Sequence, residues 1–382
     1  MPKKFIPYST QLIDSDDIKA VVATLKSDFL TQGPKVNEFE RKIAEYCGTK
    51  YAVAFNSGTS ALHGACFAAG ISNGDEVITS PITFVASSNC VLYCGGKPVF
   101  ADIDPETALI SIKNLKDKIT PKTKAIIPVD YSGHPCDMDE INKIAKENNL
   151  IVIEDAAHSI GALYKGKKVG TLADMTMLSF HAVKQITTGE GGIILTDNKA
   201  YFDKLVKFRT HGITREIKDV DPWYYEMQTL GFNYRITDFQ CALGITQLKK
   251  LDKFIKIRRK IAFVYNKAFA NIKEITCPPE IKNVISSYHL YPIRLHESLV
   301  DKKRQIFDEL RSLGVGVNVH YIPVPLQPYY QEMFGYQKGD FPAAEAFYES
   351  EISLPIHQKM TNADIQYVIR SVKSVIKAQS GR

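Results

Sequence analysis

Short apolar segments alternate with helix-like segments through the first two hundred residues, and this alternation restricts the fold more than any other feature. Seven segments have the length and composition of buried strands: 51–55, 76–80, 98–102, 125–130, 150–155, 175–180 and 192–197. Segments with apolar residues at helical spacing, such as "TSALHGACFAAG" and "MDEINKIAKENN", lie between several of them. Strands that are apolar throughout and separated by helices are typical of a mainly parallel sheet covered on both faces. The sequence therefore predicts an α/β fold.

The pattern changes in the last third of the chain. The basic segment "KKLDKFIKIRRK" (249–260) carries apolar residues at helical spacing. It predicts a long helix with a solvated basic side rather than a nucleic-acid surface. The segments "SYHLYPIRL" and "KKRQIFDELRSLGVGVNVHY" then give a strand–helix–strand order. We expect a large domain of residues 1–250, which includes the N-terminal segment, and a smaller α+β domain of residues 251–382.

Composition excludes several classes of protein. The 382 residues are 45% hydrophobic and 24% charged, which allows a large core and argues against disorder. A net charge of +6 suits an anionic small substrate and does not indicate nucleic-acid binding. Seven cysteines without a C-x-x-C pair predict neither a disulfide framework nor a zinc site. We find no run long enough to span a membrane and no signal-peptide core, so we expect a cytoplasmic protein.

The segment "NSGTS" (56–60) follows the first expected strand and opens a helix. In open α/β sheets, ligands bind beyond the carboxyl ends of the strands. Gly58 permits close approach to the backbone, and Thr59 and Ser60 add hydroxyls to the free N–H groups of a helix N-terminus. These residues predict a phosphate site, although the same segment is also an ordinary helix cap.

Three more segments place polar or aromatic residues after expected strands. Phe84, in "SPITF", is either a core residue or a platform for a stacked ring. Asp155 ends the most apolar strand, where it either caps backbone N–H groups or meets a partner. The segment "SFHAVKQITTGEGG" (179–192) contributes Ser179, His181 and Lys184. Its lysine is either a surface charge or a reactive amine.

Together these residues match the requirements of one cofactor. Pyridoxal phosphate needs a lysine for the Schiff base, a carboxylate on the pyridinium nitrogen, a phosphate site and an aromatic cover. All four are expected at the same edge of the sheet. Nucleotide-binding alternatives fail, because "TTGEGG" lacks the following Lys-Ser/Thr and no G-x-G-x-x-G follows the first strand. Neither H-E-x-x-H nor a serine nucleophile elbow is present.

At these residues the sequence resembles the DegT/DnrJ/EryC1/StrS family of sugar-nucleotide aminotransferases. The resemblance runs through "LTQGPKVNEFE", "NSGTSAL", "SPITFVAS", "YSGHPCDMDEI", "IEDAAHSIGA", "SFHAVKQITTGEGG", "GFNYRITDFQCALG" and "VHYIPVPLQPYY". It implies the fold of type I PLP-dependent transferases, with a mainly parallel seven-stranded sheet. Within the family it is strongest to members that aminate C4 in pseudaminic acid biosynthesis, to which "YSTQ", "NVHYIP" and "YESEISLPIH" point.

The resemblance also implies roles for single residues. The catalytic residues would be Lys184, which forms the Schiff base, Asp155, which pairs with the pyridinium nitrogen, and His158 beside the ring. The other cofactor-binding residues would be Gly58, Thr59, Ser60 and Ser179 at the phosphate, Phe84 on the ring, and Asn233 from a second subunit. The sugar-nucleotide site would be lined by Tyr8, Leu30, Thr31, Gly58, Ser179, Asn233, His320, Tyr321 and Ile322. No metal is implied.

Two residues of the resemblance need comment. Gln185 follows the lysine, whereas relatives usually have proline there. Asn233, in "GFNYR", precedes a strongly helical segment, so it is either a cap of that helix or a residue that crosses to the partner. A branch of the family that has histidine in place of the lysine dehydrates its substrate, and Lys184 argues against that branch.

We therefore expect a homodimeric aminotransferase with shared active sites. It would transfer the amino group of L-glutamate to C4 of a UDP-linked 4-keto-6-deoxy-N-acetylhexosamine of the pseudaminic acid pathway. One alternative keeps the chemistry but changes the sugar to a dTDP-4-keto hexose, a 3-keto hexose or a bacillosamine precursor. Another alternative is a non-catalytic PLP-binding regulator, but no residues are spare for the DNA-binding domain that such a regulator usually carries.

Overall fold

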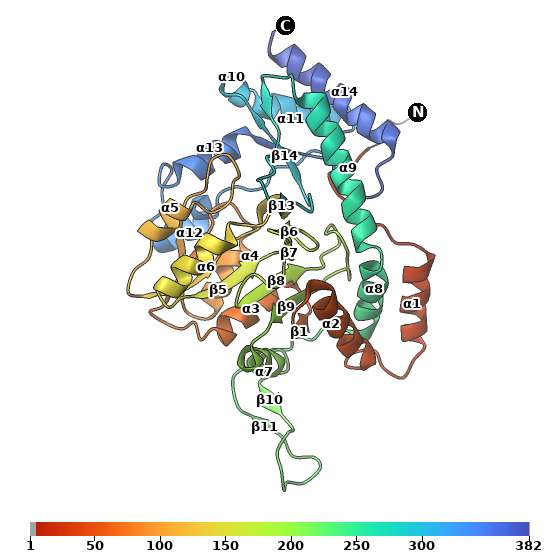
Figure 1. The fold of residues 1–382 in the computed structure, drawn as a ribbon, viewed down its shortest axis with the longest axis vertical. Coiled ribbons are helices and arrows are strands. Elements are labelled where there is room, and N and C mark those ends of the chain that lie inside the picture. The colour runs from red at the N-terminus through yellow and green to blue at the C-terminus, as the bar shows by residue number, and fades with distance from the viewer. Residues whose placement is uncertain (1–4, 382) are drawn as a thin grey trace.

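A seven-stranded sheet forms the centre of the molecule (Figure 1). The computed structural model describes residues 5–381. The strand order is β1-β9-β8-β5-β4-β2-β3. The bounds are β1 (Tyr51–Phe55), β2 (Glu76–Thr79), β3 (Lys97–Phe100), β4 (Thr123–Ile127), β5 (Ile151–Asp155), β8 (Met175–Ser179) and β9 (Gly192–Thr196). The bounds of each strand agree to within a few residues with those of a segment expected from the sequence. The α/β fold class is confirmed.

Both faces of this sheet are buried, which is why its strands are apolar throughout. In β1, Ala52 and Ala54 belong to one hydrophobic cluster, whereas Val53 and Phe55 belong to another. Because side chains alternate between the faces of a strand, the two clusters lie on opposite sides of the sheet. The helices that pack around it are α1 (Ser15–Leu25), α2 (Pro34–Cys47), α3 (Gly58–Ala68), α4 (Ala86–Tyr93), α5 (Ile112–Asp117), α6 (Met138–Glu147), α7 (Lys199–Phe208) and α8 (Asp238–Leu248).

Strand direction is mainly parallel, with one reversal. The pairs β2–β3, β2–β4, β4–β5 and β5–β8 are parallel. Strand β9 runs antiparallel to both β8 and β1. The carboxyl ends of β1, β2, β5 and β8 therefore meet at one edge of the sheet. The loops that carry the predicted cofactor residues leave from this edge.

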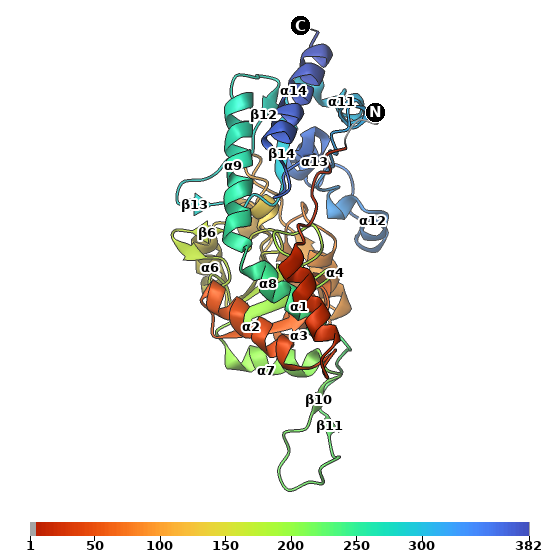
Figure 2. The ribbon, with the colours of Figure 1, turned by 90° about the vertical axis from the view of Figure 1, so that its right-hand side faces the viewer.

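The C-terminal third packs partly around a cluster of its own, whereas Tyr330, Phe341 and Phe347 join a cluster of the large sheet. The long helix α9 (Leu251–Phe269) follows α8 and leads to this part (Figure 2). Here an antiparallel sheet, β12-β14-β15, carries buried Tyr291, Ile293 and Ile352 in a separate hydrophobic cluster. Its elements are β12 (Ile275–Thr276), β14 (Tyr291–Leu295), β15 (Glu351–Leu354), α10 (Glu297–Val300), α11 (Lys303–Ser312), α12 (Pro328–Phe334), α13 (Pro342–Ser350) and α14 (Asn362–Gln379). A domain boundary at residue 250 remains a prediction.

Two smaller sheets complete the fold. One joins β6 (Leu163–Tyr164), β7 (Lys167–Lys168) and β13 (Val284–Ile285). The other is the hairpin of β10 (Ile213–Thr214) and β11 (Glu226–Met227), which projects away from the body in both views (Figures 1 and 2). We call residues 213–231 the arm. Within residues 5–381, no helix combines the length and the apolar character that a bilayer crossing requires.

Candidate active site

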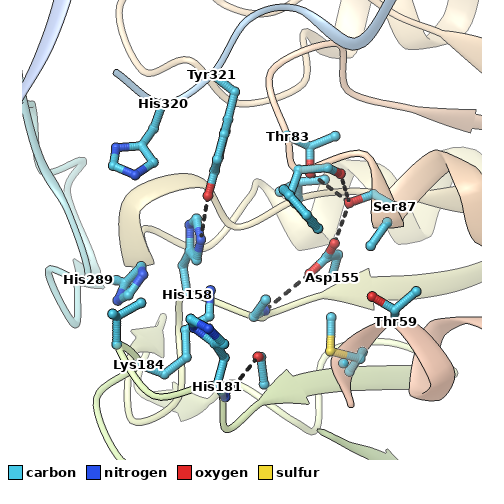
Figure 3. A pocket seen from close by; sticks show the side chains of 18 of the residues that line it. Thr59, Thr83, Ser87, Asp155, His158, His181, Lys184, His289, His320 and Tyr321 are labelled. Atoms are coloured by element: carbon cyan, nitrogen blue, oxygen red, sulfur yellow. Dashed lines mark hydrogen bonds between the residues drawn. The ribbon is translucent and has the colours of Figure 1, made fainter. Parts of the chain in front are cut away.

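A cavity of about 620 Å³ lies at the carboxyl ends of β1, β2, β5 and β8. Residues from the N-terminal segment and from residues 318–321 close it from the side of the C-terminal third. The predicted residues that line it are Tyr8, Gly58, Thr59, Phe84, Asp155, His158, Ser179, His181, Lys184, His320 and Tyr321. The loops therefore bring most of the predicted residues to one place (Figure 3).

The start of α3 provides an anion site on the cavity wall. Ser57 is the N-cap and shares a capping box with Ser60. The Ser60 hydroxyl also donates to Asn56 Oδ1 at 2.7 Å, so it is used inside the helix start and does not line the cavity. Gly58 and Thr59 stand in the first turn, where N–H groups have no intrahelical acceptor. These two N–H groups and the positive helix end suit a phosphate.

Asp155 is held at the end of β5 as a buried carboxyl group. Its Oδ2 accepts from Ser87 Oγ at 2.6 Å, and Ser87 in turn contacts Thr83 Oγ1 at 2.6 Å. Its Oδ1 accepts from Ala157 N at 3.2 Å. Burial raises the pKa of Asp155, while these hydrogen bonds and the Lys184 amine lower it. A positively charged group in the cavity would complete this environment.

His158 lies between two other rings of the site. Tyr321 Oη and His158 Nε2 are 3.2 Å apart, and the centroids of His158 and His289 are 4.4 Å apart (Figure 3). Burial lowers the pKa of both histidines well below the usual value, and the nearby Lys184 acts in the same direction. Both rings are therefore neutral at pH 7. Among the described residues, His158 Nδ1 has no hydrogen-bond partner although it is buried.

Lys184 is a buried amine. Burial lowers its pKa to about 8, and Arg258 adds to this effect, while Asp155 opposes it. A usable fraction of the amine is therefore neutral near pH 7, as a nucleophile requires. The loop is fixed locally because Lys184 N donates to His181 O at 2.9 Å and Ser9 Oγ donates to Val183 O at 3.0 Å. The side chain lines the cavity and is only partly exposed, which argues against the interpretation of Lys184 as a surface charge.

The Thr-Gly segment after the lysine returns the chain into β9 with both of its threonines buried. Thr187 Oγ1 donates to Phe180 O at 3.0 Å and accepts from Gly189 N at 2.8 Å. Thr188 Oγ1 donates to Glu190 O at 2.6 Å. Gly192 then lies against the start of α3, where a Cβ would stand 2.5 Å from Ser57 O. The threonines replace missing backbone partners, and the glycine lets β9 approach α3.

Several predicted residues lie outside this cavity. Leu30 and Thr31 are exposed in the connection between α1 and α2, and Asn233 and Ile322 are also exposed. Asn233 does not cap the following helix, because Thr237 is the N-cap of α8.

Sequence reasoning missed the residues that support the predicted ones. Ser87 is four residues from Thr83, and this spacing at a helix start could have suggested a shared hydrogen bond. His289 had no such signal, since it joins the site through its contact with His158 from a distant segment. Phe84 lines the cavity with 60% of its side chain exposed, 6.4 Å from the ring of Tyr321. It therefore lies at the surface of the cavity and not in the core.

Comparison with known proteins decides the family. The model of the DegT/DnrJ/EryC1/StrS aminotransferase family matches residues 11–373. The chain belongs to this family. It is therefore a sugar aminotransferase with the type I PLP-dependent transferase fold, as the sequence predicted. The family is PLP-dependent, and the residues of the cavity fit that cofactor: a buried amine, a buried carboxyl group and a free helix N-terminus face one space.

Three similar proteins match this chain over nearly their whole length. The UDP-4-amino-4,6-dideoxy-N-acetyl-beta-L-altrosamine transaminase of Campylobacter jejuni is 40% identical over 97% of this chain and 98% of its own. The structure of PseC from Helicobacter pylori, an aminotransferase of pseudaminic acid biosynthesis, has a TM-score of 0.93 and 36% identity over 98% of this chain and all of its own. The structure of Spr1654 from Streptococcus pneumoniae, described as a "putative sugar aminotransferase" in its "PLP-form", has a TM-score of 0.92 and 33% identity, and the match covers 98% of this chain and 99% of Spr1654.

Proposed function

We propose that the protein transfers the amino group of L-glutamate to C4 of a UDP-linked 4-keto-6-deoxy-N-acetylhexosamine, as in pseudaminic acid biosynthesis. The observation that carries the reaction class is the buried, partly neutral Lys184 amine facing the same cavity as Asp155 and the start of α3. Full-length similarity to altrosamine transaminases supports the choice of sugar. A UDP-linked substrate is also consistent with the net positive charge of the chain.

The proposed roles follow from the environment of each side chain. Bound pyridoxal phosphate supplies an electrophilic carbon and an electron-withdrawing ring. Lys184 would bind the cofactor covalently and, once released, move a proton at the reacting carbon. Asp155 would hold the proton on the pyridine nitrogen, with Ser87 fixing its orientation. Gly58, Thr59 and Ser179 would bind the phosphate, and neutral His158 would pack beside the ring.

We also propose that the active unit is a homodimer in which Asn233 completes the partner's site. The backbone next to Asn233 is fixed, since Asn56 N donates to Tyr234 O at 2.9 Å. The side chain of Asn233 itself is exposed. The nearby arm exposes apolar side chains, including Trp223 and Leu230, each 73% exposed. A second copy of the chain would cover such surface.

Three experiments test the proposal. Borohydride reduction of the protein loaded with pyridoxal phosphate, followed by peptide mapping, should place the pyridoxyl group on Lys184. A label on another residue would overturn the role of Lys184. Lys184→Arg should be inactive, because a guanidinium stays protonated.

A panel of UDP- and dTDP-linked 3- and 4-ketosugars with glutamate, analysed by NMR of the amino product, tests the substrate. Preferential amination of a dTDP-sugar or of C3 would favour the alternative sugars.

A further inference from the structure

Gln185, the residue after Lys184, is fully buried and does not line the cavity. Its Nε2 donates to the carbonyl oxygen of His158 and to Ser287 Oγ, the latter at 2.9 Å. Ser287 Oγ donates to the same His158 carbonyl at 2.8 Å. We call these three groups, the Gln185 amide, the Ser287 hydroxyl and the His158 carbonyl, the Gln185 joint. Each of them bonds the other two.

The Gln185 joint connects three side chains that line the cavity. Gln185 is adjacent to Lys184, Ser287 is two residues before His289, and His158 provides the shared acceptor. The rings of His158 and His289 are in contact, with centroids 4.4 Å apart. The three segments are far apart in the sequence, so the joint is a direct link between them at this point. Displacing it would displace the lysine relative to both rings.

The joint is also tightly enclosed. Ser287 N donates to Gly133 O at 3.0 Å. Gly133 has φ +97°, and a Cβ there would lie 2.5 Å from Ser287 Oγ and 2.9 Å from His158 O. A side chain at residue 133 would therefore collide with the joint. Close packing on this side leaves the hydrogen-bonded groups little freedom to move.

We propose that Gln185 is a positioning residue for transamination, whose amide fixes Lys184, His158 and His289 relative to one another. A carboxamide is suited to this place because its single NH₂ group serves two acceptors, which a carboxylate or an apolar side chain cannot do. The inference rests on the proposed role of Lys184. It assigns Gln185 no contact with substrate or cofactor.

The test compares two buried amides. Gln185→Met keeps the length of the side chain and removes both donors. Gln247→Met is the matched control: Gln247, on α8, is also fully buried and donates from Nε2 to Leu12 O at 3.0 Å and to Asp17 Oδ2 at 2.7 Å, outside the cavity. Both variants lose two buried hydrogen bonds, and only one of them loses the joint.

The measurement is the rate at which full-length protein, stripped of cofactor, regains visible absorption on addition of pyridoxal phosphate, as a function of pH. The charged groups that act on Lys184 are Asp155 and Arg258, and its histidine neighbours are neutral. In Gln185→Met, a looser site admits water and the pKa of Lys184 moves up toward its ordinary value. The pH at which the rate of cofactor recapture reaches half its maximum should rise by about half a pH unit or more. Recapture near pH 7 should slow by about threefold or more.

Steady-state kinetics and Ser287→Ala add an independent check. Gln185→Met should lower kcat while KM for the sugar nucleotide stays within about twofold, because substrate contacts are unchanged.

In the double variant Gln185→Met/Ser287→Ala, the His158 carbonyl loses both donors. The loss in recapture rate should therefore exceed the product of the losses in the two single variants. Multiplicative losses would overturn the idea of a shared joint.

The outcomes separate the two proposals. If Gln185→Met melts at a lower temperature, as Gln247→Met is expected to do, but keeps the wild-type pH profile, Gln185 is a structural residue and the inference is wrong. If Gln185→Met does not fold, Ser287→Ala decides, and an unchanged profile overturns the inference. If Lys184→Ala still regains the visible band, the proposed role of Lys184 fails instead.

Discussion

Burial raises the pKa of Asp155 above its ordinary value, and a cation bound next to the carboxyl group would lower it again. Asp155→Asn keeps the shape of the side chain and can still accept from Ser87, but it cannot hold the pyridinium proton by charge. We expect the variant to bind cofactor and to lose activity on the order of a hundredfold. Absorbance and steady-state kinetics on the same sample measure both. A rate near that of wild type would show that Asp155 only caps Ala157 N.

Glu351, on β15, is a buried carboxyl group next to His320, which lines the cavity. It accepts from His320 N at 2.8 Å and from the Ser353 hydroxyl, and burial raises its pKa to about 8. A raised pKa means that its contribution to stability is complete below the ordinary carboxyl range and is lost as the pH rises through the raised value.

Glu351→Gln stays neutral and should not show this loss. The difference in melting temperature, variant minus wild type, should therefore be larger at about pH 9 than at about pH 5, by about 2 °C or more. Thermal unfolding at constant ionic strength measures the difference. A gap that does not change with pH would contradict the prediction.

Residue types and their positions after strands were sufficient to find Lys184, Asp155, Gly58 and Thr59, because each follows a recognisable buried strand. Their supporting contacts could not be found in the same way. The hydroxyl of Ser60 was expected at the phosphate, yet the helix start uses it internally. His289 enters the site through tertiary packing, which leaves no periodic signal in the sequence.

Strand β9 and helix α3 meet at two glycines that differ in the space available for a side chain. A Cβ on Gly192 would lie 2.5 Å from Ser57 O and 2.7 Å from Gly58 N, which are backbone atoms that cannot turn aside. A Cβ on Gly58 would have its nearest contact at 3.4 Å, at Ser179. The tight approach therefore depends on Gly192, although the sequence drew attention to Gly58.

We expect Gly192→Ala to lower the free energy of unfolding by about 1–3 kcal/mol and to weaken binding of pyridoxal phosphate, since α3 must move. Gly58→Ala should change the free energy of unfolding, without cofactor, by about 0.5 kcal/mol or less. Urea unfolding of the two stripped proteins gives the comparison. Equal stability of the two variants would show that the contact at Gly192 is not limiting.

The number of strands was predictable from apolar segments, but the direction of β9 was not. A strand buried on both faces is apolar throughout whichever way it runs. Its reversal follows from the compact Thr-Gly loop, which returns the chain directly beside β8. The long helix α9 was predictable because its apolar face repeats at helical spacing, with buried Leu251, Phe254 and Ile261.

Two chains should be needed for full activity. Lys184→Ala and Asn233→Ala homodimers should each be impaired. After subunit exchange, a hybrid holds one site with both lesions and one with neither, so activity should return to about a quarter to a half of wild type. Native mass spectrometry confirms hybrid formation. Confirmed hybrids that recover nothing, with a clearly damaging Asn233 mutation, would place Asn233 in its own chain's site.

The sheet order has a consequence for how the chain is made. Strand β1 pairs with β9, Tyr51 opposite Thr196, and β9 is the last of the seven strands to leave the ribosome. Until then β1 is an apolar strand without its neighbour, and such edges pair with other nascent chains. Slow translation between Phe55 and Gly192 lengthens that interval. The yield of folded protein should therefore depend on codon choice across this stretch more than on the codons that follow it.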